Sequence, residues 1–449
     1  MTKELTNGHP LKIIFNFAVP VFLGFLFQQF YNLVDTIIVG RFLGVDALAA
    51  VGATGSLNFM IIGFCMGICS GFAIPVAQTF GGGNIPSMKQ FVFCAWILTA
   101  VFSVALTVPA VISCRKLLEL LKTPQNILDL SSSYFSVILS GIPAVLLYNF
   151  LSGIIRSVGD SKTPLFFLIF SAILNIVLDI VFIALFKTGI KGAAWATVLS
   201  QGTAGIFCFF FMKKHLKILS LEKSDRKISV KKINSLLGIG IPMGLQYSIT
   251  AIGSVILQWS VNILGSIYVA SMATAQKISI FFSTPFDALG TTMATYGGQN
   301  VGAHKFERLN SGLFWACLLG AVYSVLGFLC LWLFSDSLTS LFINPKESLE
   351  TVLHVKENVR FCLLATAAFY FFLALVNIVR FMIQGMGFSK FAVLAGVFEL
   401  VGRAVIGFVF VPKFGFKAAC LASPLAWILA DSFLVPAYFW CRKKLMELK

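Results

Sequence analysis

The feature that most constrains this chain is a succession of long apolar stretches, separated by short polar segments, along most of its 449 residues. The first stretch, residues 13–40, contains a single charged residue, Asp35, between Lys12 and Arg41. A helix needs about 20 apolar residues to cross a hydrocarbon core about 30 Å thick. Stretches of this length therefore predict membrane-spanning helices.

Composition supports this interpretation, because 58% of the residues are hydrophobic and only 12% are charged, against roughly 25% charged in soluble domains. Windows of about 19 apolar residues predict twelve spans, an all-α polytopic membrane protein with both termini on one side. The expected spans are residues 13–40, 47–80, 90–113, 127–155, 164–186, 190–212, 235–263, 268–298, 311–334, 351–384, 391–412 and 415–441.

The distribution of Lys and Arg predicts which side that is. With both termini on the inner side, the inner segments hold most of the basic residues, eight of them in residues 213–234. Because basic residues accumulate in cytoplasmic loops, we expect cytoplasmic termini in a multi-pass protein of the cell membrane. The formal charge of +16 then reflects topology and attraction to anionic membrane lipid. No basic face interleaved with aromatic residues indicates nucleic-acid binding.

The chain divides into two similar halves. We expect an N-lobe at 1–212, a cytoplasmic linker at 213–234 and a C-lobe at 235–449. Pro20 matches Pro242, and GIKGAAWAT at 189–197 matches GFKAACLAS at 415–423. Because each half has six spans, the repeats share one orientation, which is a transporter arrangement suited to alternating access. A duplicated channel or membrane enzyme would also show such repeats.

Polar residues recur at helical spacing on three spans of the first half. An Asp at the centre of a bilayer costs about 2.5 to 3.5 kcal/mol, and a rise of about 1.5 Å per residue puts Asp35, Asp179 and Thr197 in the outer half of the membrane. Two carboxyl groups there predict an oxygen cage for a monovalent cation or a shared proton. The alternative is structural hydrogen bonding between helices. The stripes are Gln28, Asn32, Asp35 and Thr36; Ser171, Asn175 and Asp179; Thr197 and Gln201.

The second half lacks this constellation. Asn175 aligns with Arg403 and Asp179 with Gly407, while the position of Asp35 falls at Ile256 or Leu257. Glu399 and Arg403, at spacing i, i+4, are interpreted as a self-neutralising structural pair. The sequence assigns no role to Asp287, Asp431 or Lys277.

The chain resembles the multidrug and toxic compound extrusion (MATE) transporters, in particular their DinF-like bacterial branch. The resemblance covers nearly the whole chain and rests on Pro20 and on NLVDTIIVG at 32–40, RSVGDSKTP at 156–164, LNIVLDIVF at 174–182 and KGAAWAT at 191–197. It implies a V-shaped pair of six-helix lobes that exports amphipathic, often cationic, drugs and toxic compounds in exchange for inward protons or sodium ions. We expect such a protein to act as a monomer.

The resemblance also implies roles for particular residues. The NorM-like branch carries acidic residues in its C-lobe where this chain has Thr250 and Leu373, so coupling is expected in the N-lobe alone. A proline-induced bend at Pro20 would link the charge of Asp35 to the shape of the cavity. The implied cation site is Asp35, Asn175, Asp179 and Thr197, and the implied substrate cavity is Gln28, Tyr31, Tyr134 and Asn149.

Two other classes of protein fit less well. An enzyme is not expected, because the four histidines lie in or near predicted loops without metal-ligand spacing, and no phosphate-binding GxxxxGK[ST] motif occurs. We therefore expect no cofactor besides the coupling ion, H+ or Na+. A lipid-linked oligosaccharide flippase of related helix arrangement is the nearer alternative. Such flippases tend to have a basic cavity, whereas the polar groups expected here are acidic or neutral, with Arg380 and Arg403 as the exceptions.

Overall fold

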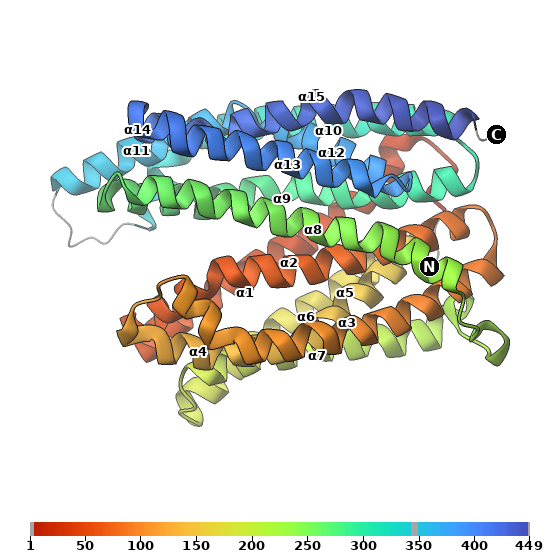
Figure 1. Cartoon of the computed structure of the whole chain (residues 1–449), viewed down its shortest axis with the longest axis horizontal. Helices are drawn as coiled ribbons and strands as arrows, with labels where there is room; N and C mark the ends of the chain where they lie inside the picture. The colour runs from red at the N-terminus through yellow and green to blue at the C-terminus, as the bar shows by residue number, and fades with distance from the viewer. Residues whose placement is uncertain (1–3, 343–348, 448–449) are drawn as a thin grey trace. The chain divides into compact units, whose positions relative to one another are not determined.

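The computed structural model describes residues 4–342 and 349–447, which form helices and contain no strand (Figure 1). The first half contains α1 (Pro10–Leu43), α2 (Val45–Gly81), α3 (Ile85–Leu120), α4 (Gln125–Ser140), α5 (Ile142–Ser157), α6 (Lys162–Asp179), η1 (Ile180–Leu185) and α7 (Ile190–His215). Two short helices follow, η2 (Lys217–Leu219) and η3 (Lys223–Asp225). The second half contains α8 (Val230–Asn262), α9 (Ser266–Gly302), α10 (Glu307–Ser340), α11 (Leu349–Ala367), α12 (Tyr370–Gly385), α13 (Ser389–Val405), η4 (Ile406–Phe410), α14 (Val411–Phe414) and α15 (Phe416–Glu447).

These helices confirm the predicted all-α membrane fold. In the described part of the chain, nine helices are long and apolar enough to span a membrane, or eleven when each of two bent pairs counts as one span. The spans predicted at 127–155 and 351–384 are these pairs, bent by 42° between α4 and α5 and by 47° between α11 and α12. The span predicted at 268–298 corresponds to α9, which is long but less apolar because it carries Lys277, Asp287 and many small polar residues.

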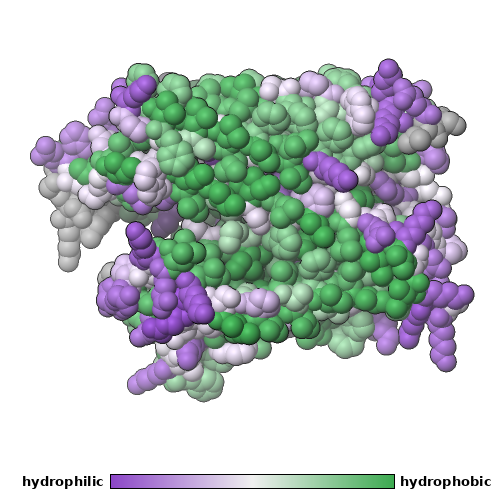
Figure 2. Space-filling view, in the orientation of Figure 1, coloured by the Kyte–Doolittle hydropathy of each residue, from purple (hydrophilic) through white to green (hydrophobic). Residues whose placement is uncertain are grey.

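The surface suits a lipid environment. Apolar residues cover much of the face in Figure 2, and hydrophilic residues gather toward the ends of the helices. Large apolar side chains are strongly exposed, among them Ile112 at 75% and Phe166 at 65%. Soluble proteins rarely expose apolar surface on this scale, so lipid chains are the natural partner of these side chains.

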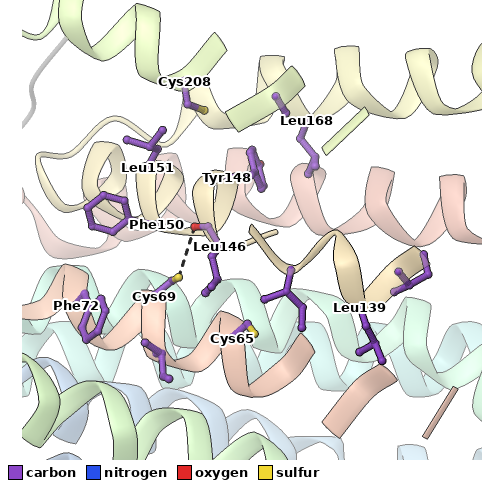
Figure 3. Packing of buried hydrophobic residues seen from close by; sticks show 14 of the residues in the cluster. Cys65, Cys69, Phe72, Leu139, Leu146, Tyr148, Phe150, Leu151, Leu168 and Cys208 are labelled. Carbon is purple, nitrogen blue, oxygen red and sulfur yellow. Dashed lines mark hydrogen bonds between the residues drawn. The ribbon is translucent and has the colours of Figure 1, made fainter. Parts of the chain in front are cut away.

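The chain forms two compact units. One comprises residues 1–7, 19–248 and 298–304, and the other comprises residues 8–18, 249–297 and 305–449. The core of the first unit lies around α2 and α5, where Cys65, Cys69 and Phe72 are buried (Figure 3). The Cys69 thiol donates to the Leu146 carbonyl over 3.7 Å. These two cysteines are free thiols and serve as small packing residues. In the second unit, α15 packs against α11, α12 and α13.

Both halves contain a π-helical segment. Helix α6 passes into η1 directly after Asp179, and α13 passes into η4 directly after Val405. A π-helix accommodates an additional residue per turn and often marks a functional position. Periodicity of 3.6 residues gave no indication of either segment. In the first half the distortion begins directly after Asp179, a residue that the sequence had singled out.

Gly141 allows the close approach of α7 to the bend between α4 and α5. A Cβ atom at this position would overlap Cγ2 of Val198, whereas a Cβ at Gly55, within α2, would have no neighbour within 4 Å. We expect Gly141→Ala to destabilise the protein by about 1 to 3 kcal/mol through overpacking. Gly55→Ala is the matched control and should be neutral or stabilising by up to about 1 kcal/mol. Thermal unfolding of the purified variants measures the difference, and equal midpoints would contradict this packing argument.

Candidate functional site

The centre of the candidate site is a pair of buried carboxyl groups in the first unit. Asp35 lies on α1 and is 8% exposed, while Asp179 ends α6 and is fully buried. The two carboxyl groups lie within hydrogen-bonding reach of each other. Among the described residues, no donor reaches Oδ1 of Asp35 or either oxygen of Asp179. Because two ionised carboxylates in contact repel each other strongly in a low dielectric, this arrangement favours a proton or a cation between them.

Neutral oxygen atoms lie next along α6. Asn175, one helical turn before Asp179, is 1% exposed, and its Nδ2 donates to Oγ1 of Thr197 on α7 over 3.5 Å. The Thr197 hydroxyl donates in turn to the Ala193 carbonyl over 3.2 Å. Oδ1 of Asn175 has no donor among the described residues. Carboxylate, amide and hydroxyl oxygens are ligands for hard cations, so these four residues have the chemistry of a sodium or proton site.

The four residues predicted for the substrate cavity separate into two pairs. Gln28 and Asn149 line a cavity of about 40 Å³, together with Pro20. Tyr31 and Tyr134 are not among its lining residues. The Tyr31 hydroxyl instead accepts a hydrogen bond from Nε2 of Gln201 over 3.2 Å, and Tyr134 interacts electrostatically with both Asp35 and Asp179. Tyr31 also interacts electrostatically with Asp35, so both tyrosines act on the carboxyl pair and not on the cavity.

Arg156 also lines this cavity, although the sequence analysis assigned it no role. The predicted span ended at residue 155, whereas α5 continues to Ser157 and carries Arg156 within the helix. Its guanidinium donates to the Ser152 hydroxyl, over 3.1 Å from Nε and also from Nη2. No carboxylate of the described residues forms an ion pair with it. The RSVGDSKTP motif at 156–164 was the signal that could have identified it.

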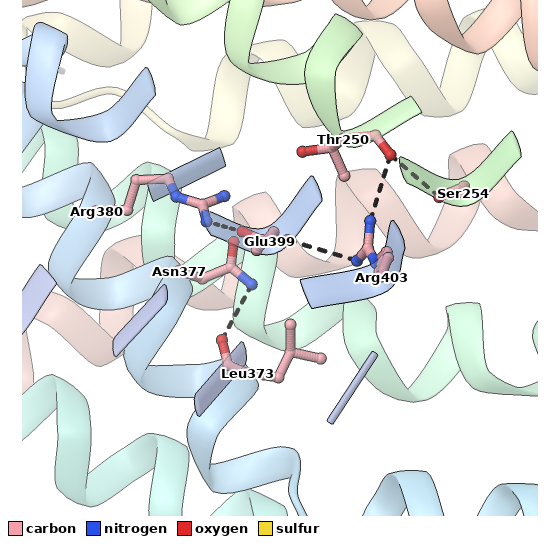
Figure 4. Close-up of polar contacts among 7 residues, drawn as sticks. All are labelled: Thr250, Ser254, Leu373, Asn377, Arg380, Glu399 and Arg403. Atoms are coloured by element: carbon pink, nitrogen blue, oxygen red, sulfur yellow. Dashed lines mark hydrogen bonds and ion pairs between the residues drawn. The ribbon is translucent and has the colours of Figure 1, made fainter. Parts of the chain in front are cut away.

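The second unit contains a different buried polar cluster (Figure 4). The Glu399 carboxylate on α13 accepts from Arg380 on α12 and from Nη2 of Arg403, the latter over 3.4 Å. Arg403 also donates from Nη1 to the Thr250 carbonyl over 3.3 Å. The pair of Glu399 and Arg403 predicted from sequence is therefore present, but Arg380 joins it, and all three side chains are buried.

The apolar helices define the class of protein as a polytopic membrane protein, and the internal repeat together with the buried ionisable groups is typical of a transporter. The MatE family model matches residues 20–181 and again residues 242–409, more than half of the chain. The chain therefore belongs to the MATE family of multidrug efflux transporters. It is a transporter and not an enzyme, as predicted, and members of this family typically reside in the plasma membrane.

Curated relatives and solved structures agree with this assignment. The chain is 30% identical to the probable multidrug resistance protein YoeA of Bacillus subtilis, with 74% of this chain and 73% of YoeA covered. It is 29% identical to the probable multidrug resistance protein YpnP of the same organism, with 77% of each covered. The fold matches an outward-facing multidrug resistance MATE family transporter with a TM-score of 0.90 at 23% identity, over 99% of this chain and 98% of that one.

Proposed function

We propose that this chain is a cation-coupled antiporter that exports amphipathic or cationic drugs and toxic compounds by alternating access, with H+ or Na+ as the coupling ion. The observation that carries the proposal is the contact between the buried carboxyl groups of Asp35 and Asp179, which have almost no protein donors. Ionised carboxyl groups in this position are costly without a compensating cation. Binding and release of a cation would therefore change the electrostatic free energy of the carboxyl pair greatly.

Pro20 offers a way for this change to alter the shape of α1. The helix continues through Pro20, but a proline has no backbone N–H, so one helical hydrogen bond is missing at this turn. Pro20 is buried and lines the same cavity as Gln28 and Asn149. We propose that α1 bends here when the charge at Asp35 changes, which would alter the shape of this small cavity and so the space available to the exported compound.

The proposed partners are a small drug-like molecule, membrane lipid and the coupling ion. Relatives named as multidrug resistance proteins support a small-molecule substrate, and the apolar surface supports contact with lipid. We further propose that the protein acts as a monomer with both termini in the cytoplasm. The family assignment does not favour the flippase alternative.

Dye efflux from proteoliposomes tests the proposed function. A fluorescent cationic dye is loaded, and either a pH gradient or a sodium gradient is imposed across the membrane. We expect efflux to accelerate with one of the two gradients and to stop when an ionophore dissipates it. Efflux that is indifferent to both gradients would refute cation coupling.

Thr197→Val distinguishes the two coupling ions. Valine keeps the shape of threonine but removes the hydroxyl oxygen that accepts from Asn175. A sodium ion needs several oxygen ligands, so we expect sodium-driven efflux to require about tenfold more sodium if sodium is the coupling ion, a loss of about 1.4 kcal/mol. If a proton is the coupling ion, the carboxyl pair suffices and efflux should remain within about twofold of the wild type. Initial efflux rates over a series of sodium concentrations and pH values give the answer, with Thr203→Val on the same helix as control.

A further inference from the structure

Asp431 is a buried carboxyl group in the second unit that neither the sequence nor the proposed coupling mechanism uses. It lies in the apolar run AWILADSFL of α15 and is 6% exposed. Neither of its carboxylate oxygens has a hydrogen-bond donor among the described residues. Because burying an ionised carboxylate without a partner is far more costly than burying a neutral one, the geometry favours a carboxyl group that holds a proton.

The charges around Asp431 come from several helices. Asp431 interacts electrostatically with Arg380 on α12 and Glu399 on α13, and with Cys317 on α10. Arg403 shares Glu399 with Arg380. Asp287 on α9 adds a carboxyl group that interacts with Arg380. Arg380 is therefore the positively charged group that could serve as an ion-pair partner for Asp431.

Arg380 nevertheless pairs with Glu399 and not with Asp431. Its Nη2 donates to Glu399, while its Nε has no acceptor among the described residues. One buried guanidinium with an unused donor thus lies near a buried carboxyl group with two unused acceptors. If Asp431 were ionised, it would compete with Glu399 for Arg380. The observed arrangement is the one expected when Asp431 is neutral.

We propose that Asp431 is a second proton-binding site of the transporter, in its C-terminal half, and that its protonation decides whether Arg380 pairs with Glu399 alone or also with Asp431. The ligand is a proton and not a metal cation, because the positive charge of Arg380 acts on Asp431 and repels a metal cation, and no group of three or more metal-ligating His, Cys, Asp or Glu side chains occurs among the described residues. Asp431 lies on α15. Thr250 and Leu373, the positions where the NorM-like branch carries acidic residues, lie on α8 and α12. The proposed proton site is therefore a different one.

Infrared spectroscopy of the purified full chain tests this proposal without relying on transport. The difference spectrum between wild type and Asp431→Asn at neutral pH should contain the C=O stretching band of a protonated carboxyl group, which the variant has lost. Asp336→Asn is the matched control, since Asp336 lies on α10, is 52% exposed and pairs with Arg360 over 2.8 Å. The spectrum of Asp336→Asn should retain the protonated C=O band that Asp431→Asn loses.

Two further variants keep the outcome decisive. If Asp431→Asn does not fold, Asp431→Glu serves in its place. This variant retains a carboxyl group, so its protonated C=O band should shift from the wild-type position and not disappear.

The second comparison is made in an Asp35→Asn background. The difference spectrum between Asp35→Asn and the double variant Asp35→Asn with Asp431→Asn should still contain the Asp431 band, so the result stands even if the N-lobe coupling proposal fails. A difference spectrum with only ionised carboxylate bands, or an unmoved protonated band in Asp431→Glu, would overturn the proposal.

Discussion

Asp35→Asn should abolish gradient-driven efflux while leaving the protein folded. Asparagine preserves the size of the side chain but cannot bind or release a proton and carries no charge for a cation. Since Asp35 contacts Asp179, the variant should leave Asp179 without its partner carboxyl group. We expect the gradient-dependent rate to fall by at least about 100-fold, which corresponds to a loss of about 2.7 kcal/mol. Initial rates of dye efflux from proteoliposomes under the active gradient measure this loss.

Two comparisons give this experiment its specificity. Asp179→Asn should match Asp35→Asn, because the two carboxyl groups act as one unit. Asp46→Asn makes the same chemical change at an exposed position in the first turn of α2 and should transport at the wild-type rate. Wild-type coupling in Asp35→Asn would show that the carboxyl pair is a structural contact between α1 and α6.

Glu399→Gln should destabilise the second unit strongly. The substitution removes the carboxylate shared by Arg380 and Arg403, both of which are buried. Removing one partner of a buried ion pair leaves uncompensated charge and costs about 3 to 5 kcal/mol. We expect a large drop in the thermal unfolding midpoint of the protein in detergent.

The control for Glu399→Gln is the exposed ion pair of Arg360 and Asp336. Because solvent screens this pair, Asp336→Asn should cost only about 0 to 1 kcal/mol. The double variant Glu399→Gln with Arg403→Met should recover part of the lost stability, since it also removes one of the two stranded charges. Equal unfolding midpoints for Glu399→Gln and Asp336→Asn would show that the cluster is solvated and not a buried network.

The sequence predicted the helical membrane fold well because long apolar stretches leave few other solutions. The contact between Asp35 and Asp179 was also foreseeable, since both positions lie at a similar depth on polar stripes. Their role in coupling stays a prediction. The close approach of Val198 to Gly141 was not foreseeable, because it depends on how a distant helix packs.

The polar cluster of the second unit could be predicted from the sequence only in part. Spacing on one helix identified the pair of Glu399 and Arg403, but no spacing rule connects Arg380 on α12 or Asp431 on α15 with them. Such contacts depend on how α12, α13 and α15 rotate as they pack. Arg156 was missed for a simpler reason, since the predicted span ended one residue before it and α5 ends after it.

The two π-helical segments separate the distortion of the backbone from the presence of an acidic side chain. They follow Asp179 in one half and Val405 in the other, at nearly equivalent places in the duplicated sequence, although Gly407 stands where the first half has Asp179. The same backbone distortion therefore occurs in both halves, beside an acidic side chain in one half and without it in the other. The irregular turn does not depend on the carboxyl group of Asp179.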